Sequence, residues 1–406
     1  MKKKALWVDN QPSSLFGQDS DAFYYEERAL LSAASGDIVI VDFEVDNDYI
    51  EQLRKLTAYQ SIELICLKNK YDDLVESILN WEGIISFREY LKEIGCILRS
   101  YLPDRRIKLL SRHLGITARG VDFYEANKCQ IDLIMLWEKL CLRKIETQFL
   151  SNSTKEEVVN FFESNKLVLC KPNCTIGGKG IFNVKKLDEL KSMNLLQNEK
   201  SGYVLQRELK PDLEGSIQFL LDDGIFHIYI CRTYNPQHSF GGFRYPCETE
   251  LLLQLKKDGE RIATHFMQKY KEDIDSFGID FIISDGEIYY HDLNPRKTSV
   301  SYVLLFLKKI CSSFEVLENH QVCCLYFKIA RNFSYRELRA ILEESDIPQL
   351  IEDGVGVMII NPDLIKTGLM QIVSFSRSHR ETEYLERTIQ HFAKKGVAVQ
   401  CPDIVM

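Results

Sequence analysis

The stretch that decides the fold is His291-Asp292-Leu293-Asn294-Pro295-Arg296, which ends a predicted strand. Successive side chains on a strand point to opposite faces, so Asp292 and Asn294 share a face and offer two hard oxygen ligands to a cation. A second segment, Thr175-Ile176-Gly177-Gly178-Lys179-Gly180, is a glycine-rich turn between two predicted strands. Its glycines let backbone N–H groups approach phosphate oxygens, because no β-carbon intrudes. Together the two segments predict a site for a magnesium nucleotide.

Each segment also has a simpler explanation. The turn is not a Walker A loop, because G-x-x-x-x-G-K-[ST] requires a glycine where this chain has Asn173. Taken alone it could be an ordinary hairpin turn, and Asp292–Arg296 could be a capped strand end. The nucleotide interpretation therefore depends on further residues in the right order.

Composition describes an ordinary globular protein. The 406 residues are 45% hydrophobic and 27% charged, enough for two or three domains. A net charge of -8 argues against nucleic-acid binding, which needs clustered cations. No apolar run reaches the ~20 residues that span a bilayer, and Met1-Lys2-Lys3-Lys4 leads into a short strand rather than a signal peptide. We expect no membrane partner, a cytoplasmic location and, for the twelve cysteines without a C-x-x-C pair, reduced thiols.

Short apolar runs alternate with amphipathic stretches in the first hundred residues. They predict parallel strands at Ala5–Val8, Ile38–Val41, Ile62–Leu67 and Gly83–Phe87. No G-x-G-x-x-G motif follows any of them, so a dinucleotide site has no phosphate cradle. We interpret this region as a small α/β domain with a supporting role.

Antiparallel strands dominate the middle of the chain. The segments Ser216–Leu221 and Ile225–Ile230 flank the hairpin signal Asp222-Asp223-Gly224. After about Cys311 the pattern predicts a two-layer tail, with strands and helices at Val322–Phe327, Ser334–Glu344, Val355–Ile360 and Glu381–Lys395.

An ordered set of residues across the middle of the chain resembles the ATP-grasp superfamily. The resemblance covers roughly residues 115 to 310 and rests on Lys128, Lys171, the Gly177–Gly180 turn, Gln206-Arg207-Glu208-Leu209, Glu214, Asp280 and Asp292-x-Asn294-Pro295-Arg296. It implies a mixed α/β and α+β fold in which two antiparallel sheets clamp a nucleotide. The implied domains are 1–112 (N-terminal α/β), 113–310 (ATP-grasp core, with a lid at about 145–206) and 311–406 (C-terminal α/β appendage).

The resemblance also assigns the nucleotide site. Lys128 and Lys171 would hold the α and β phosphates of ATP, with Lys171 also counted as catalytic. The turn with Gly177, Gly178, Lys179 and Gly180 would be the mobile part of the lid that covers the triphosphate. Adenine would contact Gln206, Glu208, Leu209 and Glu214. Gln206 departs from the glutamate that is common at this hinge position.

Asp280, Asp292 and Asn294 would hold magnesium, with two ions implied and Mn²⁺ as a substitute. Hairpin register decides whether Asp280 can take part. A strict two-residue turn at Asp285-Gly286 sets Asp280 opposite His291 and turns its carboxylate away from Asp292. A three-residue loop, or a bulge, sets Asp280 opposite Asp292. We expect the second arrangement, because two carboxylates bridging magnesium suit phosphoryl transfer.

Arginines supply forked donors for a carboxylate or acyl phosphate. Arg296 is the catalytic and substrate-binding candidate, and Arg232 and Arg244 are substrate candidates that could equally be surface arginines. His238, in the loop from Pro236 to Pro246, is expected to be a polar loop residue.

The resemblance implies an ATP-dependent ligase that joins a carboxylate to an amine through an acylphosphate. Its substrates would be small molecules, with amino acids or peptides expected, and the chain could act as a homodimer. Architecture and the Asn294-Pro295-Arg296 ending also resemble pheganomycin-type peptide ligases. The alternatives are a ligase for a non-peptide metabolic acid and an inactive nucleotide-binding regulator. A biotin-dependent carboxylase is disfavoured, because no Met-Lys-Met carrier segment occurs.

Overall fold

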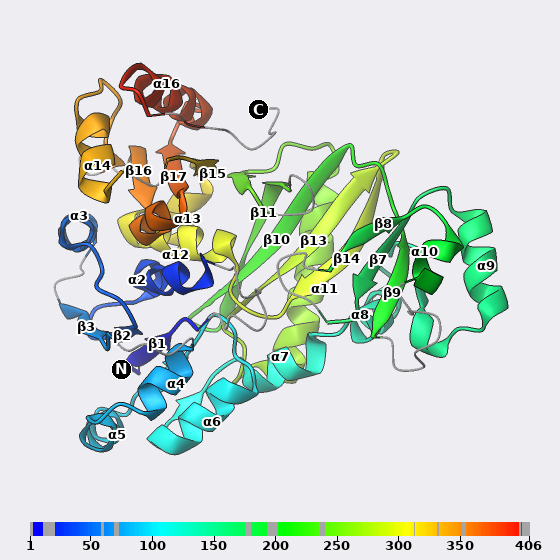
Figure 1. Cartoon of the computed structure of the whole chain (residues 1–406), viewed down its shortest axis with the longest axis horizontal. Coiled ribbons are helices and arrows are strands. Elements are labelled where there is room, and N and C mark those ends of the chain that lie inside the picture. The colour runs from blue at the N-terminus through cyan, green and yellow to red at the C-terminus, as the bar shows by residue number, and fades with distance from the viewer. Residues whose placement is uncertain are drawn as a thin grey trace.

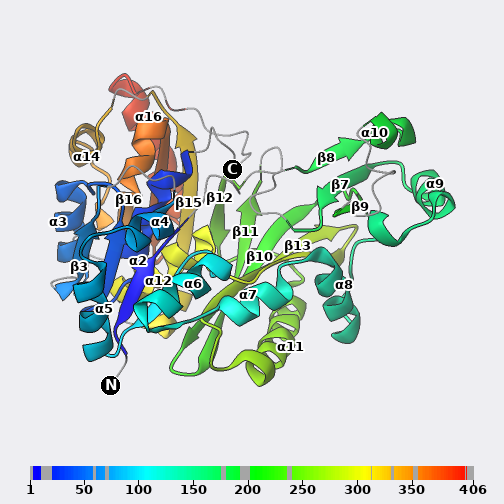
Figure 2. The same ribbon diagram turned by 60° about the horizontal axis from the view of Figure 1, so that its bottom comes forward.

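The structure of this protein is a computed structural model of the whole chain (Figures 1 and 2). It describes residues 3–10, 21–57, 61–68, 73–174, 180–192, 202–235, 240–311, 313–330, 333–350, 355–397 and 399. In the part of the chain covered by these ranges, no helix is both long and apolar enough to cross a lipid bilayer.

A parallel sheet forms the N-terminal part, in the strand order β3-β2-β1-β4-β5. The predicted α/β layer is therefore confirmed. The strands are β1 (Ala5–Val8), β2 (Ile38–Val41), β3 (Glu63–Cys66), β4 (Ile97–Arg99) and β5 (Thr117–Ala118). Around them lie the 3₁₀ helix η1 (Asp21–Arg28) and helices α2 (Ala29–Ser32), α3 (Asn47–Leu56), α4 (Leu74–Leu79), α5 (Ile84–Glu93) and α6 (Arg105–Leu114).

The strand predicted at Gly83–Phe87 is wrong, because these residues begin helix α5. Ile84, Phe87 and Leu91 are buried in that helix, and their spacing of three and four residues is that of a helix face. The strand that fills the sheet is instead the short β4, which the sequence analysis did not predict.

Two helices, α7 (Val121–Asn127) and α8 (Gln130–Lys139), lead into a small antiparallel sheet of order β6-β9-β7-β8. We call this sheet and its helices the lid; Figure 1 shows it at one end of the molecule. Its elements are β6 (Thr147–Phe149), η3 (Leu150–Asn152), α9 (Lys155–Ser164), β7 (Val168–Pro172), β8 (Phe182–Val184), α10 (Leu187–Ser192) and β9 (Tyr203–Arg207).

The largest sheet has eight strands, in the order β14-β13-β10-β11-β12-β15-β17-β16. It contains β10 (Leu213–Asp222), β11 (Ile225–Tyr234), β12 (Gly242–Tyr245), β13 (Ser276–Ser284), β14 (Glu287–Asn294), β15 (Gln321–Lys328), β16 (Gly356–Ile360) and β17 (Leu369–Ser376). Each of these strands pairs antiparallel with its neighbours. The two antiparallel sheets expected from the sequence are thus present.

Helix α11 (Leu252–Tyr270) covers one part of the large sheet through a core of phenylalanines. Phe219 and Phe277 stack with ring centroids 4.2 Å apart, and Phe266 of α11 meets Phe277 edge-on at 5.0 Å. This face positions β13 and β14, the strands that carry the predicted metal ligands.

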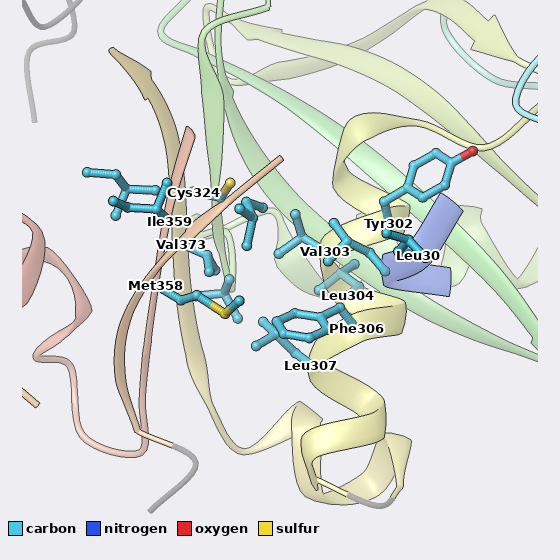
Figure 3. Packing of buried hydrophobic residues seen from close by; sticks show 14 of the residues in the cluster. Leu30, Tyr302, Val303, Leu304, Phe306, Leu307, Cys324, Met358, Ile359 and Val373 are labelled. Atoms are coloured by element: carbon cyan, nitrogen blue, oxygen red, sulfur yellow. The ribbon is translucent and has the colours of Figure 1, made fainter. Parts of the chain in front are cut away.

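The C-terminal strands belong to the same sheet, because β15 pairs with β12. Helix α12 (Ser299–Cys311) packs between these strands and the N-terminal helix α2, as Figure 3 shows for Phe306, Met358 and Leu30. Figures 1 and 2 both show the N- and C-terminal parts side by side. The remaining C-terminal helices are α13 (Phe314–Glu318), α14 (Tyr335–Glu343), η5 (Pro362–Thr367) and α16 (Glu381–Lys394).

At Gly242 the backbone of β12 lies too close to β15 for a side chain. Its φ is +148°, and a Cβ there would lie 2.3 Å from the carbonyl oxygen of Cys324. We expect Gly242→Ala to lower the free energy of unfolding by about 1–3 kcal/mol, measured by urea denaturation, because the added carbon has no room. A Cβ at Gly202 would meet nothing within 4 Å, so Gly202→Ala is the control. Equal stability of the two variants would contradict the tight β12–β15 junction.

Candidate functional site

The β13–β14 hairpin combines a two-residue turn with a bulge. Ser284 pairs with Glu287, so the turn is Asp285-Gly286, with φ of 52° and 73° at these two residues. The register then shifts between Asp280 and Phe281, and Asp280 pairs with Asp292. The extra residue is His291, which stands in β14 between the partners of these two positions. Of the two arrangements that could align the carboxylates, the bulge is present and the three-residue loop is wrong.

The bulge brings the three predicted metal ligands together. Asn294 Nδ2 donates to Asp280 Oδ2 at 2.9 Å, and Gln130 Nε2, from the first turn of α8, donates to Asp292 Oδ1 at 3.0 Å. Burial and the negative charge of Asp292 raise the pKa of Asp280 to about 7. Two carboxylates this close repel one another unless a proton or a cation lies between them.

This donor set fits Mg²⁺, which typically takes one or two carboxylates and completes its shell with water and substrate phosphates. Within the described ranges there is no cluster of three or more His, Cys, Asp or Glu side chains placed to hold a metal by themselves. Asp280, Asp292 and the Asn294 amide would therefore share the ion with a bound triphosphate. Their role as metal ligands remains a prediction.

Lys171 joins the lid to this hairpin. It lies on β7 with 4% of its surface exposed, and its Nζ donates to the backbone carbonyl of His291 at 3.4 Å. Burial lowers the pKa of Lys171, while the charges of Asp292 and Asp280 oppose that change. Burial and Lys171 together lower the pKa of His291 to about 3, so this imidazole is neutral at pH 7. Lys171 is thus the cation beside the carboxylate pair.

Arg296 fixes the amide of Asn294 from the other side. Its Nη2 donates to Asn294 Oδ1 at 3.1 Å and its Nη1 to the carbonyl of Lys297 at 2.9 Å. Its guanidinium also lies 4.5 Å from the ring centroid of Tyr101, at the end of β4. Asp280, Asn294 and Arg296 therefore form one hydrogen-bonded row that points from the hairpin toward the N-terminal sheet.

The nucleotide-binding candidates are spread along the lid and its approach. Lys128 follows α7 and pairs with Glu125 at 2.8 Å. Gln206 is buried on β9 and donates to Thr147 Oγ1 at 3.0 Å, so its side chain supports the lid. Glu208 accepts from Asn183 at 3.4 Å.

Further along, Leu209 is half-buried in the connection to β10, and Glu214 on β10 accepts a hydrogen bond from Asn235 at 2.6 Å. Gly180 has φ of 74° and follows the lid turn. Gly177, Gly178 and Lys179 lie outside the described residues, as does His238. Nucleotide contacts for all of these residues remain predictions.

Arg232 and Arg244 face each other on β11 and β12. Arg232 is exposed, with its guanidinium 5.3 Å from the ring centroid of Tyr234. Arg244 donates to the fully buried Glu381 of α16 at 2.9 Å. The Arg244 side chain therefore ties α16 to the sheet in this structure, and the substrate role of both arginines remains a prediction.

Gln130 and Tyr101 were missed by the sequence analysis. Gln130 is a polar residue at a helix start, 162 positions from its partner Asp292, and nothing in its local sequence marks it. Tyr101 did carry a signal, because it lies just beyond β4, at the sheet edge where ligands of parallel sheets bind. That signal was lost with the missed strand.

Similarity to known proteins agrees with this architecture. Residues 139–300 match the family model described as an ATP-grasp domain. None of the curated proteins compared with the chain matches it in sequence.

Solved structures similar to the chain include N5-carboxyaminoimidazole ribonucleotide synthetases. The enzyme from Thermus thermophilus is 10% identical, with 96% of this chain and 97% of that chain covered and a TM-score of 0.60. The Aspergillus clavatus enzyme with ATP is 11% identical, with 97% and 99% covered and a TM-score of 0.57. The Aspergillus clavatus enzyme with ADP and 5-aminoimidazole ribonucleotide is 12% identical, with 97% and 99% covered and a TM-score of 0.55.

At these identities the similar structures establish the fold, and the family model identifies the domain within it. Nothing among these similarities supports the narrower resemblance to pheganomycin-type peptide ligases. Residues 139–300 of the chain are thus similar to an ATP-grasp domain, and the fold of the chain is similar to that of these synthetases.

Proposed function

We propose that the chain uses ATP to join a carboxylate substrate to an amine through an acylphosphate. The observation that carries this proposal is the bulged hairpin, which pairs Asp280 with Asp292 and offers the carbonyl of His291 to Lys171. That contact places the cation of the lid directly beside the paired carboxylates. A triphosphate held by the lid would thus meet its metal ligands and its neutralising lysine at the same point.

Each residue has a separate task in the proposed reaction. A bound Mg²⁺, held by Asp280, Asp292 and Asn294, would neutralise charge on the phosphates. Lys171 adds a buried positive charge on the lid side. Arg296 is the candidate for a carboxylate or an acyl phosphate, and it would bind one by releasing Asn294 or the carbonyl of Lys297, to which its two Nη atoms donate. The substrate carboxylate attacks the γ phosphorus and releases ADP. The amine then attacks the acyl carbon, loses a proton and expels phosphate.

Amino acids or peptides remain our first candidates for the substrates. The similar structures favour a second candidate, because N5-carboxyaminoimidazole ribonucleotide synthetases match nearly the whole chain and their named product is not a peptide. In that case the acid would be bicarbonate or another non-peptide acid. An inactive regulator was considered because of the uncertain register at Asp280, and the bulge removes that reason.

Product analysis separates the two candidates. The purified chain is incubated with Mg²⁺ and ATP, either with pooled amino acids or with bicarbonate and 5-aminoimidazole ribonucleotide. We expect ADP release in one of the two mixtures, measured by a coupled assay, and mass spectrometry then identifies the acylated amine. If ATP binds but neither mixture increases ADP release, both candidates are wrong.

Removal of one metal ligand should abolish turnover. Asp292→Ala deletes a carboxylate from the pair, and we expect ADP release to fall by on the order of 100-fold or more, because a metal supplies several kcal/mol of charge stabilisation. Glu287→Ala is the control, since Glu287 is exposed at the far end of the same strand. Unchanged turnover in Asp292→Ala would show that this carboxylate holds no essential metal.

The raised pKa of Asp280 predicts a pH-dependent cost to stability in metal-free protein. Its pKa rises from an ordinary 3.8 to about 7 in the fold. The folded state therefore binds this proton more tightly, so this group stabilises the protein less as pH rises from about 4 to about 7. Asp280→Asn cannot ionise, and we expect it to gain stability relative to the parent chain between pH 5 and pH 8, measured by urea unfolding in EDTA. A difference independent of pH, as expected for Glu287→Gln, would refute the raised pKa.

A further inference from the structure

Two cysteines meet where the lid adjoins helix α8. Cys129 is the residue directly before α8, and Cys174 follows strand β7 by two residues. Both are free thiols; Cys129 is half-buried and Cys174 is exposed. They therefore lie at a junction between two parts of the fold and have no role in the chemistry proposed above.

Backbone hydrogen bonds hold the two cysteines close together. The N–H of Gln130 donates to the carbonyl of Asn173 at 2.9 Å, and the N–H of Ile131 donates to Asn173 Oδ1 at 3.3 Å. Asn173 thus satisfies two of the N–H groups that begin α8, where the side chain of Cys129 makes no capping bond. Gln130 and Asn173 are each the direct neighbour of one cysteine. The Cα atoms of Cys129 and Cys174 are therefore only one hydrogen bond and a few covalent bonds apart.

The two thiol groups are in contact with each other. Cys174 forms a side-chain hydrogen bond with Cys129. Burial, and then this contact, raises the pKa of Cys174 to about 12, while the charge of Lys128 lowers it. The Cys174 thiol therefore keeps its proton at pH 7. A disulfide requires Cα atoms about 4.4–6.8 Å apart and side chains that point toward each other. Two thiols in contact, on segments joined by backbone hydrogen bonds, are arranged for such a bond to form.

Helix α8 is attached to the β13–β14 hairpin. Gln130 Nε2 donates to Asp292 Oδ1 at 3.0 Å, and the rings of Trp137 and Tyr290 have centroids 5.8 Å apart. Strand β7, by contrast, belongs to the lid, which Figures 1 and 2 show beside α8. The thiol pair therefore spans the boundary between the hairpin with its helix and the lid.

The hydrogen bonds across this boundary are reversible. Lys171 of β7 donates to the carbonyl of His291 at 3.4 Å, and Asn173 accepts from Gln130. Such bonds contribute little net free energy, because water replaces either partner. A disulfide between the same parts would instead keep them together until a reductant cleaves it. Because the nucleotide is proposed to lie between the lid and the hairpin, fixing these parts would slow its entry and release.

We propose that Cys129 and Cys174 are a redox-active pair whose disulfide ties the lid to α8 and slows nucleotide exchange. The disulfide itself does not depend on the reaction proposed above, whereas its effect on exchange rests on the proposed nucleotide site. In the reduced chain the lid is free to move, and in the oxidised chain the bound nucleotide is retained. Disulfides of reducing compartments are usually transient and sense oxidants in this way.

The oxidant that this step needs is a low-molecular-weight disulfide such as oxidised glutathione. Because Cys174 keeps its proton, Cys129 attacks first. It loses its proton to solvent and attacks one sulfur of the oxidant, the sulfur–sulfur bond breaks, and one glutathione leaves as a thiolate. Cys174 then gives its proton to solvent, and its sulfur attacks the Cys129 sulfur and expels the second glutathione. Each expelled thiolate takes up a proton, so two electrons pass from the protein thiols to the oxidant.

Peptide mapping tests whether the disulfide forms. The full-length chain is incubated with oxidised glutathione, the remaining thiols are blocked with iodoacetamide, and the digest is analysed by mass spectrometry. We expect a peptide pair linked through Cys129 and Cys174 that disappears after treatment with dithiothreitol. Cys129→Ser and Cys174→Ser should each abolish this pair. Cys141→Ser is the matched control and should leave it unchanged, because Cys141 is an exposed cysteine beyond the other end of α8. If Cys141 takes up glutathione while the parent chain yields no linked pair, the proposal is wrong.

Two further measurements separate the disulfide from its effect. The Tm of the oxidised parent chain should exceed that of the reduced chain by several degrees, because the cross-link restricts the unfolded chain between residues 129 and 174. Cys174→Ser treated with the same oxidant should show no such rise. The fluorescent N-methylanthraniloyl derivative of ATP is then bound with Mg²⁺ and displaced by excess ATP in a stopped-flow instrument. We expect its dissociation to be slower by about tenfold or more in the oxidised parent chain and to recover after reduction.

The outcomes distinguish this proposal from the ligase function. Equal dissociation rates in the oxidised and reduced parent chains, with the linked peptides present, would overturn the control of nucleotide exchange. A reduced parent chain that binds the ATP derivative but releases no ADP with either substrate mixture would instead disprove the ligase function alone, since neither the disulfide nor the dissociation rate depends on turnover.

Discussion

One extra residue in β14 is the constraint on which the candidate site depends. With His291 inserted, Asp280 and Asp292 oppose each other although the turn has only two residues. An unbulged hairpin would turn one carboxylate to the other face of the sheet. A bulge also leaves a backbone group outside the ladder, and here the carbonyl of His291 accepts the hydrogen bond from Lys171. The bulge thus places Asp280 opposite Asp292 and lets Lys171 of the lid contact the same hairpin.

Without a bound nucleotide and metal, that arrangement of charges costs free energy. Burial and mutual repulsion raise the pKa of Asp280, and burial lowers the pKa of Lys171, so both groups are held where their charged forms are destabilised. The phenylalanine core beneath β13 holds the strands together despite these unfavourable charges. Functional sites commonly concentrate such costs, because the charges are arranged for a ligand rather than for the fold alone.

Much of this site could be predicted from the sequence, and the exceptions have physical reasons. Period-two alternation and the Asp285-Gly286 turn signal correctly predicted the hairpin. No local sequence pattern marks a bulge, so the sequence left a bulge and a three-residue loop as alternative ways to align Asp280 with Asp292. The helix α5 was mistaken for a strand because its first apolar residues are contiguous, while its buried face continues to Leu91 at helical spacing. The contact of Gln130 with Asp292 spans 162 positions and depends on how α8 packs against β14. Local sequence patterns do not contain that information.

Arg296 lies between the β13–β14 hairpin and the residues that follow β4. On one side lies the acidic pair of Asp280 and Asp292, and on the other side Arg99, Arg119 and Lys297 surround the carboxylate of Asp275. Arg296 is 9% exposed, donates to Asn294 and lies beside the ring of Tyr101. Because it has contacts on both sides, it cannot reorient toward an anion without releasing the amide of Asn294 or leaving the ring. The position of the Arg296 side chain is therefore determined both by the β13–β14 hairpin and by Tyr101 of the N-terminal part.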